Sequence, residues 1–306
     1  DRSPSRGLGD VYKRQGRISP IYKKDNEELL ENYRPVSTLA VFGKIFEKII
    51  YNRLYSFFQS QKMIYENQYG FRKNHSTSHA LNSSVNYIES CLSKKLHVLG
   101  IFIDLSKAFD TISHEKLLNK LDNYGIRGNA NRLIASYLSN RYQYVSVLGD
   151  ESDKLPVLFG VPQGSCLGPL LFIIYVNDLF RTTDLGKFIL FADDTNIFVV
   201  DECRKKLYER ANEILRLLHQ YMKCNLLHIN IKKCCYIHFK PSRTATDNEA
   251  DNESEYILTL NNTVIKQVKE TKFLGVIIDE KLKWDVQIRA LNSKLRCEIG
   301  RLSRIR

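Results

Sequence analysis

The sequence lacks the segments that mark a secreted or membrane-spanning protein. Its longest apolar run, residues 169–176, is far shorter than the roughly 20 apolar residues that a spanning helix needs. The first residues are polar and contain no apolar core of a signal peptide. We therefore expect an intracellular protein with no membrane partner.

Cysteine patterns that would indicate zinc or disulfide chemistry are also missing. The chain has 7 cysteines, an odd number, and no two of them form a Cys-x-x-Cys pair. Neither a zinc site nor a disulfide framework follows from them, and reduced thiols fit an intracellular protein. The chain contains no internal repeat.

Length and charge narrow the class of protein further. The 306 residues are enough for a large core or for two or three subdomains. A hydrophobic fraction of 43% indicates a globular rather than a disordered chain. A net charge of +12 fits either a soluble basic surface or a polyanion partner, most often nucleic acid.

Hydrophobic periodicity predicts a mixture of helices and strands. Helical spacing occurs at residues 39–58, 76–95, 113–123, 129–139, 167–180 and 207–218, and a basic helix begins near residue 284. Strands are predicted at residues 97–104, 141–148, 155–159, 187–200, 228–239, 256–267 and 271–278. Helices mixed with antiparallel hairpins indicate an α+β fold. Residues 1–15 resemble a translated library adapter, and we exclude them from this reasoning.

The most informative stretch is a predicted hairpin with an acidic tip. Asp193 and Asp194 stand between the apolar runs 188–191 and 197–200, so the arms fix the tip by burial. Two fixed like charges repel unless a cation lies between them. A second strand ends in Asp104, and the two strands side by side would form a carboxylate cage for Mg²⁺. Two such ions are the usual means of in-line phosphoryl transfer.

Other residues near these strands have simpler interpretations. Asp104 alone fits a strand-end cap as well as a metal ligand. Asp110 follows it in the turn toward residues 113–123, and we expect it to cap that helix. Residues 160–169 form a turn rich in glycine and proline before a helix, where Gln163 offers donors and an acceptor to a nucleotide. Taken alone, this stretch fits an ordinary turn.

In combination, these motifs resemble the reverse transcriptase domain of non-LTR, LINE-type retrotransposons, near the jockey-like branch. The similarity extends from residue 17 to the end of the chain. The motifs that carry it stand in the order of the family at residues 18–24, 32–37, 67–72, 76–77, 104–110, 160–169, 191–194, 273–276 and 282–284. Each motif is weak singly, whereas the ordered series is specific.

The resemblance implies a right-hand polymerase with fingers and palm, ending at the start of a thumb. Fingers would comprise residues 16–96 and 113–155, palm residues 97–112 and 156–280, and thumb residues from 281 on. The endonuclease that normally precedes this domain and the region after the early thumb are not in the sequence, as in a fragment of a longer polyprotein. The resemblance also implies that the protein is located in the cytoplasm and the nucleus.

The resemblance also implies roles for single residues. Asp104, Asp193 and Asp194 match the catalytic triad, with the Leu105 carbonyl as a further ligand of two Mg²⁺ ions, for which Mn²⁺ is a substitute. Phe109 matches the gate that excludes a ribose 2′-OH, although a core aromatic is the alternative.

Four further residues match positions that meet the incoming nucleotide. Gln163 matches a family residue that contacts the incoming nucleotide directly. Arg34 and Arg72 match finger positions near the triphosphate, with surface arginines as the alternative. Lys233 is near the sequence position of a family lysine that protonates pyrophosphate. Lys232 is the alternative residue for this role.

The function implied is an RNA-directed DNA polymerase that extends a DNA primer on an RNA template with deoxynucleoside triphosphates. The alternatives are an RNA-directed RNA polymerase, which the bulk of Phe109 disfavours, and an inactive nucleic-acid-binding scaffold. Phe191 departs from the family, where many relatives have tyrosine, but no metal ligand is lost.

Overall fold

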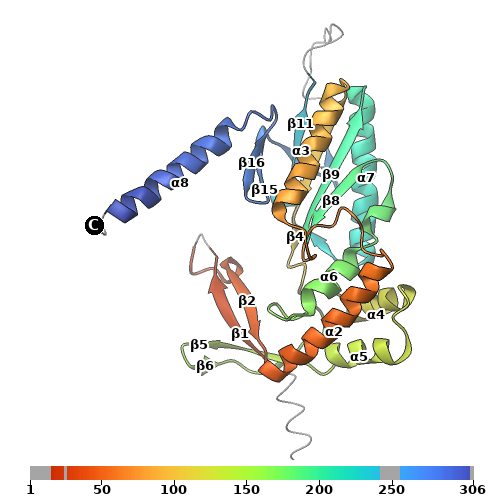
Figure 1. Ribbon diagram of the computed structural model, residues 1–306, viewed down its shortest axis with the longest axis vertical. Coiled ribbons are helices and arrows are strands. Elements are labelled where there is room, and N and C mark those ends of the chain that lie inside the picture. The colour runs from red at the N-terminus through yellow and green to blue at the C-terminus, as the bar shows by residue number, and fades with distance from the viewer. Residues whose placement is uncertain (1–14, 24–25, 242–255, 304–306) are drawn as a thin grey trace, which may run out of the picture. The chain divides into compact units, whose positions relative to one another are not determined.

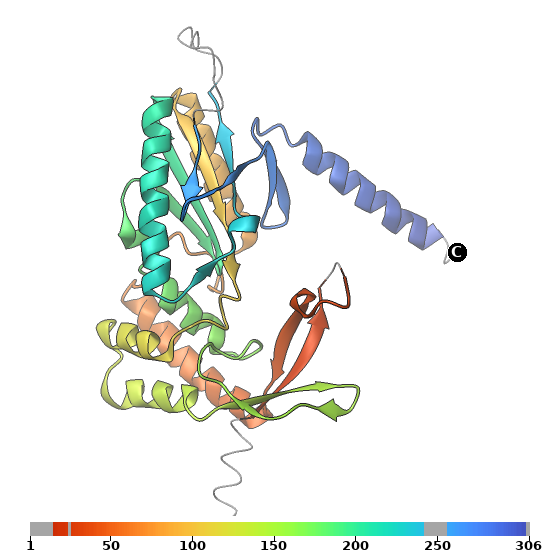
Figure 2. The ribbon, with the colours of Figure 1, turned by 180° about the vertical axis from the view of Figure 1, so that it is seen from behind.

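The computed structural model describes residues 15–23, 26–241 and 256–303, and it has the α+β fold that the sequence predicts (Figures 1 and 2). The chain divides into two compact units. The first unit comprises the chain up to Phe71, Leu105–Leu179 and Met222–His228, and the second comprises the rest. The adapter prediction for residues 1–15 lies outside the described residues except for Gln15, the first residue of a strand.

The first unit combines a sheet with several helices. The elements are β1 (Gln15–Tyr22), η1 (Leu30–Asn32), β2 (Tyr33–Thr38), α2 (Val41–Ser60), β4 (Leu105–Ser106), α4 (His114–Asn123), α5 (Gly128–Leu138), β5 (Tyr142–Val147), β6 (Asp150–Glu151), β7 (Leu155–Pro156) and α6 (Gly168–Val176). The sheet order is β2-β1-β5-β6, with β7 paired to β5. β1 pairs antiparallel with β2 and parallel with β5.

The second unit is built on a larger sheet. Its elements are α3 (Thr77–Ser93), β3 (His97–Ile103), β8 (Lys187–Phe191), β9 (Asp194–Asp201), η3 (Ile231–Lys233), β11 (Cys235–Phe239), β12 (Thr259–Leu260), β13 (Thr263–Val264), β14 (Lys266–Gln267), β15 (Glu270–Phe273), β16 (Val276–Asp279) and α8 (Asp285–Ser303). The chain passes between the units within η2 (Leu179–Thr182), α7 (Arg204–Cys224) and β10 (His228–Ile229). No described helix is long and apolar enough to cross a membrane.

Helix α6 is the centre of the first unit's core. Every residue from Leu170 to Val176 is buried, because the helix is apolar on all sides. Asn177, directly after it, is buried and fully used: its Oδ1 accepts from Tyr65 N at 2.8 Å, and its Nδ2 donates to Met63 O and Tyr124 Oη at 2.8 and 2.9 Å. These bonds fix the end of α6 in the unit.

Helix α2 forms where the helical spacing of residues 39–58 predicts it, but its apolar residues are only partly buried. Its second half buries Ile50, Leu54 and Phe58. In its first half, apolar side chains remain exposed, namely Phe42, Ile45, Phe46 and Ile49. Periodicity therefore predicted the helix correctly but not how much of its apolar face is covered.

The five-stranded sheet of the second unit has the order β14-β11-β3-β9-β8. β3 is central and antiparallel to β9 and to β11, and β8 forms a hairpin with β9. Helices α3 and α7 cover opposite faces (Figures 1 and 2). Tyr87 of α3 contacts Phe198 on one face, and Tyr208 of α7 contacts Tyr236 on the other. Burial on both faces explains why β3 is continuously apolar rather than alternating.

Three predicted strands are interrupted, and one of them, residues 271–278, forms the antiparallel pair of β15 and β16. Residues 228–239 are divided into β10, the 3₁₀ turn η3 and β11, because Cys234 N donates back to Asn230 O at 3.2 Å. Residues 256–267 contain the β12–β13 hairpin, whose loop residues Asn261 and Asn262 both have positive φ, 49° and 60°. This is the type I′ turn that asparagine tolerates.

The pH dependence of stability follows from the buried His238. Burial, as the largest cause, and the nearby His97, Arg204 and Lys240 together lower its pKa from the ordinary 6.5 to about 3. The unfolded chain binds a proton at this position below about pH 6.5 and the folded chain does not, so stability falls as the pH drops toward 3. The slope from this residue is up to ~1.4 kcal/mol per pH unit. Between about pH 7 and pH 5, the free energy of unfolding measured in urea should therefore fall by ~2 kcal/mol less in His238→Gln than in wild type. If both proteins lost the same free energy of unfolding over this pH range, a neutral buried His238 would be contradicted. A difference in stability between the two proteins near pH 7 reports the change in packing alone.

Candidate active site

Strand pairing in the second unit brings the predicted aspartates together. Phe191 and Asp194 are partners at the end of the β8–β9 hairpin, and Ala192 and Asp193 form its two-residue loop. Ile103 pairs with Thr195 across β3 and β9. Continuing this register by one residue places Asp104 opposite Asp194.

The hairpin loop is held in an unusual backbone conformation. Ala192 has φ +57°, whereas Asp193 is not among the positive-φ residues. This φ pattern corresponds to a type II′ turn, where glycine is preferred at the first position. A left-handed non-glycine residue costs of order 1–3 kcal/mol and persists only where the surrounding structure fixes it. The buried strands on both sides supply that constraint and so fix the tip.

The electrostatics agree with the pairing. Partial desolvation of the Asp194 carboxyl, as the largest cause, and the neighbouring carboxylates of Asp193 and Asp104 together raise its pKa from 3.8 to about 6. Lys233, on η3, places its Nζ 3.8 Å from Asp104 Oδ2, and Asn230 N donates to the Asp104 backbone oxygen at 2.8 Å. The carboxylates of Asp193 and Asp104 therefore act on Asp194 as like charges, and Lys233 is a basic neighbour of Asp104.

The donor chemistry of this cluster fits a hard divalent cation. All three side chains offer oxygen, the ligand that Mg²⁺ prefers. Among the described residues, no three side chains of His, Cys, Asp or Glu are grouped so that they would hold a metal ion by themselves. Mg²⁺ is usually bound by one or two carboxylates together with substrate phosphates and water rather than by a closed protein cage. The cluster fits an ion that is held jointly with a substrate.

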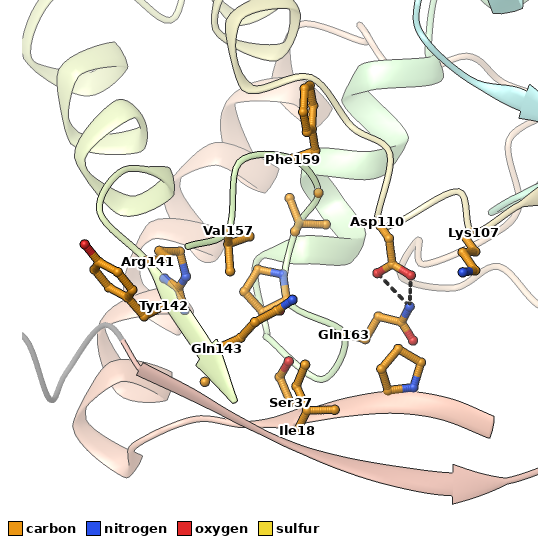
Figure 3. A pocket seen from close by; sticks show the side chains of 15 residues that line it. Ile18, Ser37, Lys107, Asp110, Arg141, Tyr142, Gln143, Val157, Phe159 and Gln163 are labelled. Atoms are coloured by element: carbon orange, nitrogen blue, oxygen red, sulfur yellow. Dashed lines mark hydrogen bonds between the residues drawn. The ribbon is translucent and has the colours of Figure 1, made fainter. Parts of the chain in front are cut away.

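In the first unit, residues 160–164 form a loop fixed to the segment 109–114 (Figure 3). Val161 N donates to Phe109 O at 2.9 Å, and Gly160 N donates to Ile112 O at 2.8 Å. A Cβ on Gly160 would lie 2.8 Å from Asp110 Cα, and a Cβ on Gly164 would lie 2.9 Å from Ser37 O. Both glycines have positive φ, so the loop requires them for space and for conformation.

The loop also defines a cavity of about 260 Å³. Among its lining residues are Ser37 of β2, Arg141 and Gln143 beside or on β5, and Gln163 of the loop (Figure 3). Sequence reasoning identified Gln163 but none of the other three as a site residue, because single polar residues on or beside a strand carry no periodic signal.

Gln163 is held from two sides. Its backbone oxygen accepts from Ser37 N at 2.7 Å, and its Nε2 lies 2.9 and 3.0 Å from Asp110 Oδ1 and Oδ2. The expectation that Asp110 caps the helix after it is therefore wrong. Ser113 caps α4 instead, accepting from Lys116 N at 3.4 Å. The serine lies directly before the helix, where its side chain reaches the free N–H groups, whereas Asp110 is in the preceding turn.

A buried carboxylate anchors the far side of the loop. Glu47 of α2 is 3% exposed, and its Oε2 accepts from Cys166 N at 2.7 Å. Tyr137 Oη donates to Glu47 Oε1 at 2.8 Å. Sequence reasoning missed Glu47, although a lone carboxylate within an apolar helical stretch was the signal that could have found it.

The remaining predicted residues lie on identifiable elements. Phe109 stacks on Phe172 with ring centroids 4.6 Å apart and meets Phe71 edge to face at 6.0 Å. Arg34 is exposed on β2 of the first unit, and Arg72 is half-buried in the second. The structure gathers Asp104, Asp193, Asp194 and Lys233 in the second unit and gathers Phe109, Asp110 and Gln163 in the first.

Solved structures show which class of fold this is. An apo telomerase from Candida tropicalis, truncated from its C-terminal domain, aligns with TM-score 0.55 over 93% of this chain and 55% of its own, at 13% identity. A telomerase from Candida albicans aligns with TM-score 0.55 over 90% of this chain and 45% of its own, at 14% identity. The chain thus has a polymerase fold, as the sequence predicted.

Sequence comparison identifies the family. The model described as "Reverse transcriptase (RNA-dependent DNA polymerase)" matches residues 21–278. The chain belongs to the reverse transcriptase family, and its relatives are those of non-LTR retrotransposons.

The relatives are considerably longer than this chain. The "RNA-directed DNA polymerase from mobile element jockey" of Drosophila melanogaster is 30% identical over 90% of this chain and 30% of its own length. The "Probable RNA-directed DNA polymerase from transposon BS" of the same species is 29% identical over 86% of this chain and 29% of its own. The chain spans about 30% of these relatives.

The close approach of the loop to β2 can be tested with two matched glycines. Gly164 has φ +103° and no room for a Cβ, whereas Gly149 has φ +102° with nothing within 4 Å. Gly164→Ala should cost ~1–3 kcal/mol more in urea unfolding than Gly149→Ala, because only the first adds a clash to the backbone strain. Equal costs would show that Gly164 is required for its φ alone.

Proposed function

We propose that this domain is an RNA-directed DNA polymerase that extends a DNA primer on an RNA template, in retrotransposition. The observation that carries the proposal is the pairing of Ile103 with Thr195, whose continuation by one residue brings Asp104 opposite Asp194. Family membership supports a nucleic-acid template and primer and divalent metal ions.

Asp104 and Asp193, with the carbonyl oxygen of Leu105, would hold two Mg²⁺ ions, with Mn²⁺ as a substitute. When bound, such ions supply the Lewis acidity that activates a primer 3′-OH and stabilises departing pyrophosphate. Asp194 completes the acidic triad, and its raised pKa supports a place among the other two charges. Lys233 is near enough to Asp104 to serve as the proton donor to pyrophosphate.

Residues of the first unit, together with Arg72 of the second, would select and orient the nucleotide. Phe109 is fixed by its stacking on Phe172, as a gate against a ribose 2′-OH must be. Gln163 would contact the deoxynucleoside triphosphate, and Arg34 and Arg72 would meet its phosphates. We assign residues 16–96 and 113–155 to fingers, 97–112 and 156–280 to palm and 281–306 to the start of a thumb. The whole polyprotein would add the endonuclease and C-terminal regions.

The acidic triad is tested by removing charge without changing shape. Asp104→Asn, Asp193→Asn and Asp194→Asn should each lower primer extension on an RNA template with Mg²⁺ by at least about a hundredfold, while template binding is retained. Asp184→Asn, exposed in the same unit, is the control and should extend normally. Equal loss of extension and binding would indicate misfolding. A wild-type chain that binds template but extends no primer would favour the inactive scaffold.

The gate is tested by sugar selectivity. Phe109→Ala should raise the incorporation of ribonucleotides relative to deoxyribonucleotides, because the bulk that meets the 2′-OH is removed. Phe42→Ala, which removes an aromatic ring that is 80% exposed on α2, is the control and should leave selectivity as in wild type. Unchanged selectivity in Phe109→Ala would remove the gate assignment. Efficient ribonucleotide use by the wild type would favour an RNA-directed RNA polymerase.

A further inference from the structure

The contact between Asp110 and Gln163 determines which end of the glutamine amide is turned away from Asp110. Both carboxylate oxygens of Asp110 lie within hydrogen-bond distance of Gln163 Nε2, at 2.9 and 3.0 Å. An ionised carboxylate only accepts hydrogen bonds, so it binds the amide nitrogen and repels the amide oxygen. Oε1 is therefore directed away from Asp110 (Figure 3).

Neither partner is free to move away. Asp110 N donates to Lys107 O at 2.8 Å, which closes the turn before α4. The backbone of Gly160 leaves no space beside Asp110, and Ser37 N holds the Gln163 carbonyl. The amide orientation is thus set by two backbone segments that are themselves joined by hydrogen bonds.

A fixed acceptor implies a donor on the ligand. Oε1 accepts hydrogen bonds only, and the cavity that Gln163 lines is also lined by Asp110 and Lys107. Nucleotides offer hydroxyl groups of this kind at the sugar. A glutamine that could rotate its amide freely would accept or donate a hydrogen bond with similar ease. It would therefore not discriminate between donors and acceptors on the ligand.

We propose that Asp110 is a positioning residue that orients Gln163 as an obligate acceptor for a nucleotide sugar hydroxyl. This inference rests on the proposed function. The hydroxyl belongs either to the incoming nucleotide, as its 3′-OH, or to the template, as a 2′-OH. Asp110 does not touch the nucleotide and acts only through the Gln163 amide.

The decisive experiment exchanges the two functional groups. In Asp110→Asn, the new amide can donate to Gln163 Oε1, so the glutamine amide can turn over. In Gln163→Glu, two carboxylates face each other at the distance of the native hydrogen bond. In the double variant, the amide introduced at position 110 can donate to one oxygen of the carboxylate introduced at position 163. The other oxygen of that carboxylate then remains an acceptor toward the cavity.

We expect each single variant to lower kcat/KM for primer extension about tenfold, mainly through KM, and the double variant to recover to within about threefold of wild type. Asp150→Asn, exposed on β6 of the same unit, is the matched control and should behave as wild type. A double variant as impaired as the product of the single effects would overturn the proposal.

Sugar selectivity separates positioning from a merely structural role. Wild type should discriminate about tenfold against whichever substrate lacks the hydroxyl, and Asp110→Asn should lose that discrimination. The two sources are a 3′-deoxynucleoside triphosphate and an RNA template with one 2′-deoxy position. Discrimination that is unchanged in Asp110→Asn for both substrates would overturn the proposal.

Equilibrium unfolding of the same variants distinguishes the two possible failures. Non-additive effects on stability would show that the pair is coupled in the folded chain, with or without catalysis. If the pair is coupled but the wild type extends no primer, the proposed function fails and Asp110 has only a structural role. If the wild type extends primers and the pair is additive in both assays, the proposed function stands and the positioning role fails.

Discussion

The arrangement of this domain depends on the antiparallel pairing of β3 with β9. That pairing sets the residue after Ile103 opposite the residue before Thr195, and both of these residues are aspartates. A shift of one residue would turn one carboxylate to the other face of the sheet. The register is held because both faces of the sheet are covered, by α3 on one side and α7 on the other, so any shift would expose buried side chains. Burial energy thereby keeps like charges together that would otherwise separate.

The first unit uses a different kind of constraint. Its 160–164 loop is fixed by backbone hydrogen bonds and by two glycines that approach neighbouring backbone more closely than any Cβ allows. The Glu47 carboxylate holds the following residues from the side of α2. Within this loop, Asp110 and Gln163 add hydrogen bonds between side chains to the backbone contacts. A functional amide placed on such a loop has little freedom of orientation, which is what a selective contact requires.

Membership in the reverse transcriptase family and the similarity to telomerase structures are consistent with the β3–β9 sheet of the second unit and the 160–164 loop of the first. The telomerases share the fold at 13% and 14% identity, so the fold tolerates wide change in sequence. Three of the family motifs of this chain, at residues 104–110, 160–169 and 191–194, fall where backbone geometry is restricted. These places are a strand end, a two-residue hairpin loop with positive φ at Ala192 and a glycine-flanked loop.

Local pattern in the sequence was enough for most of the elements, for the acidic hairpin and, through the resemblance, for the family. Apolar periodicity is a property of neighbours along the chain, so α3, α4, α6 and the β8–β9 hairpin could be read directly. Strands β1 and β2 were not predicted, because neither has the alternation of a half-buried strand and each carries a proline. Only tertiary structure decided that Asp110 binds Gln163 rather than capping α4, that Glu47 supports the loop after Gly164, and that half of α2 leaves its apolar face exposed. Each of these depends on which distant segment comes to lie beside the residue, and one residue's local sequence carries no record of that.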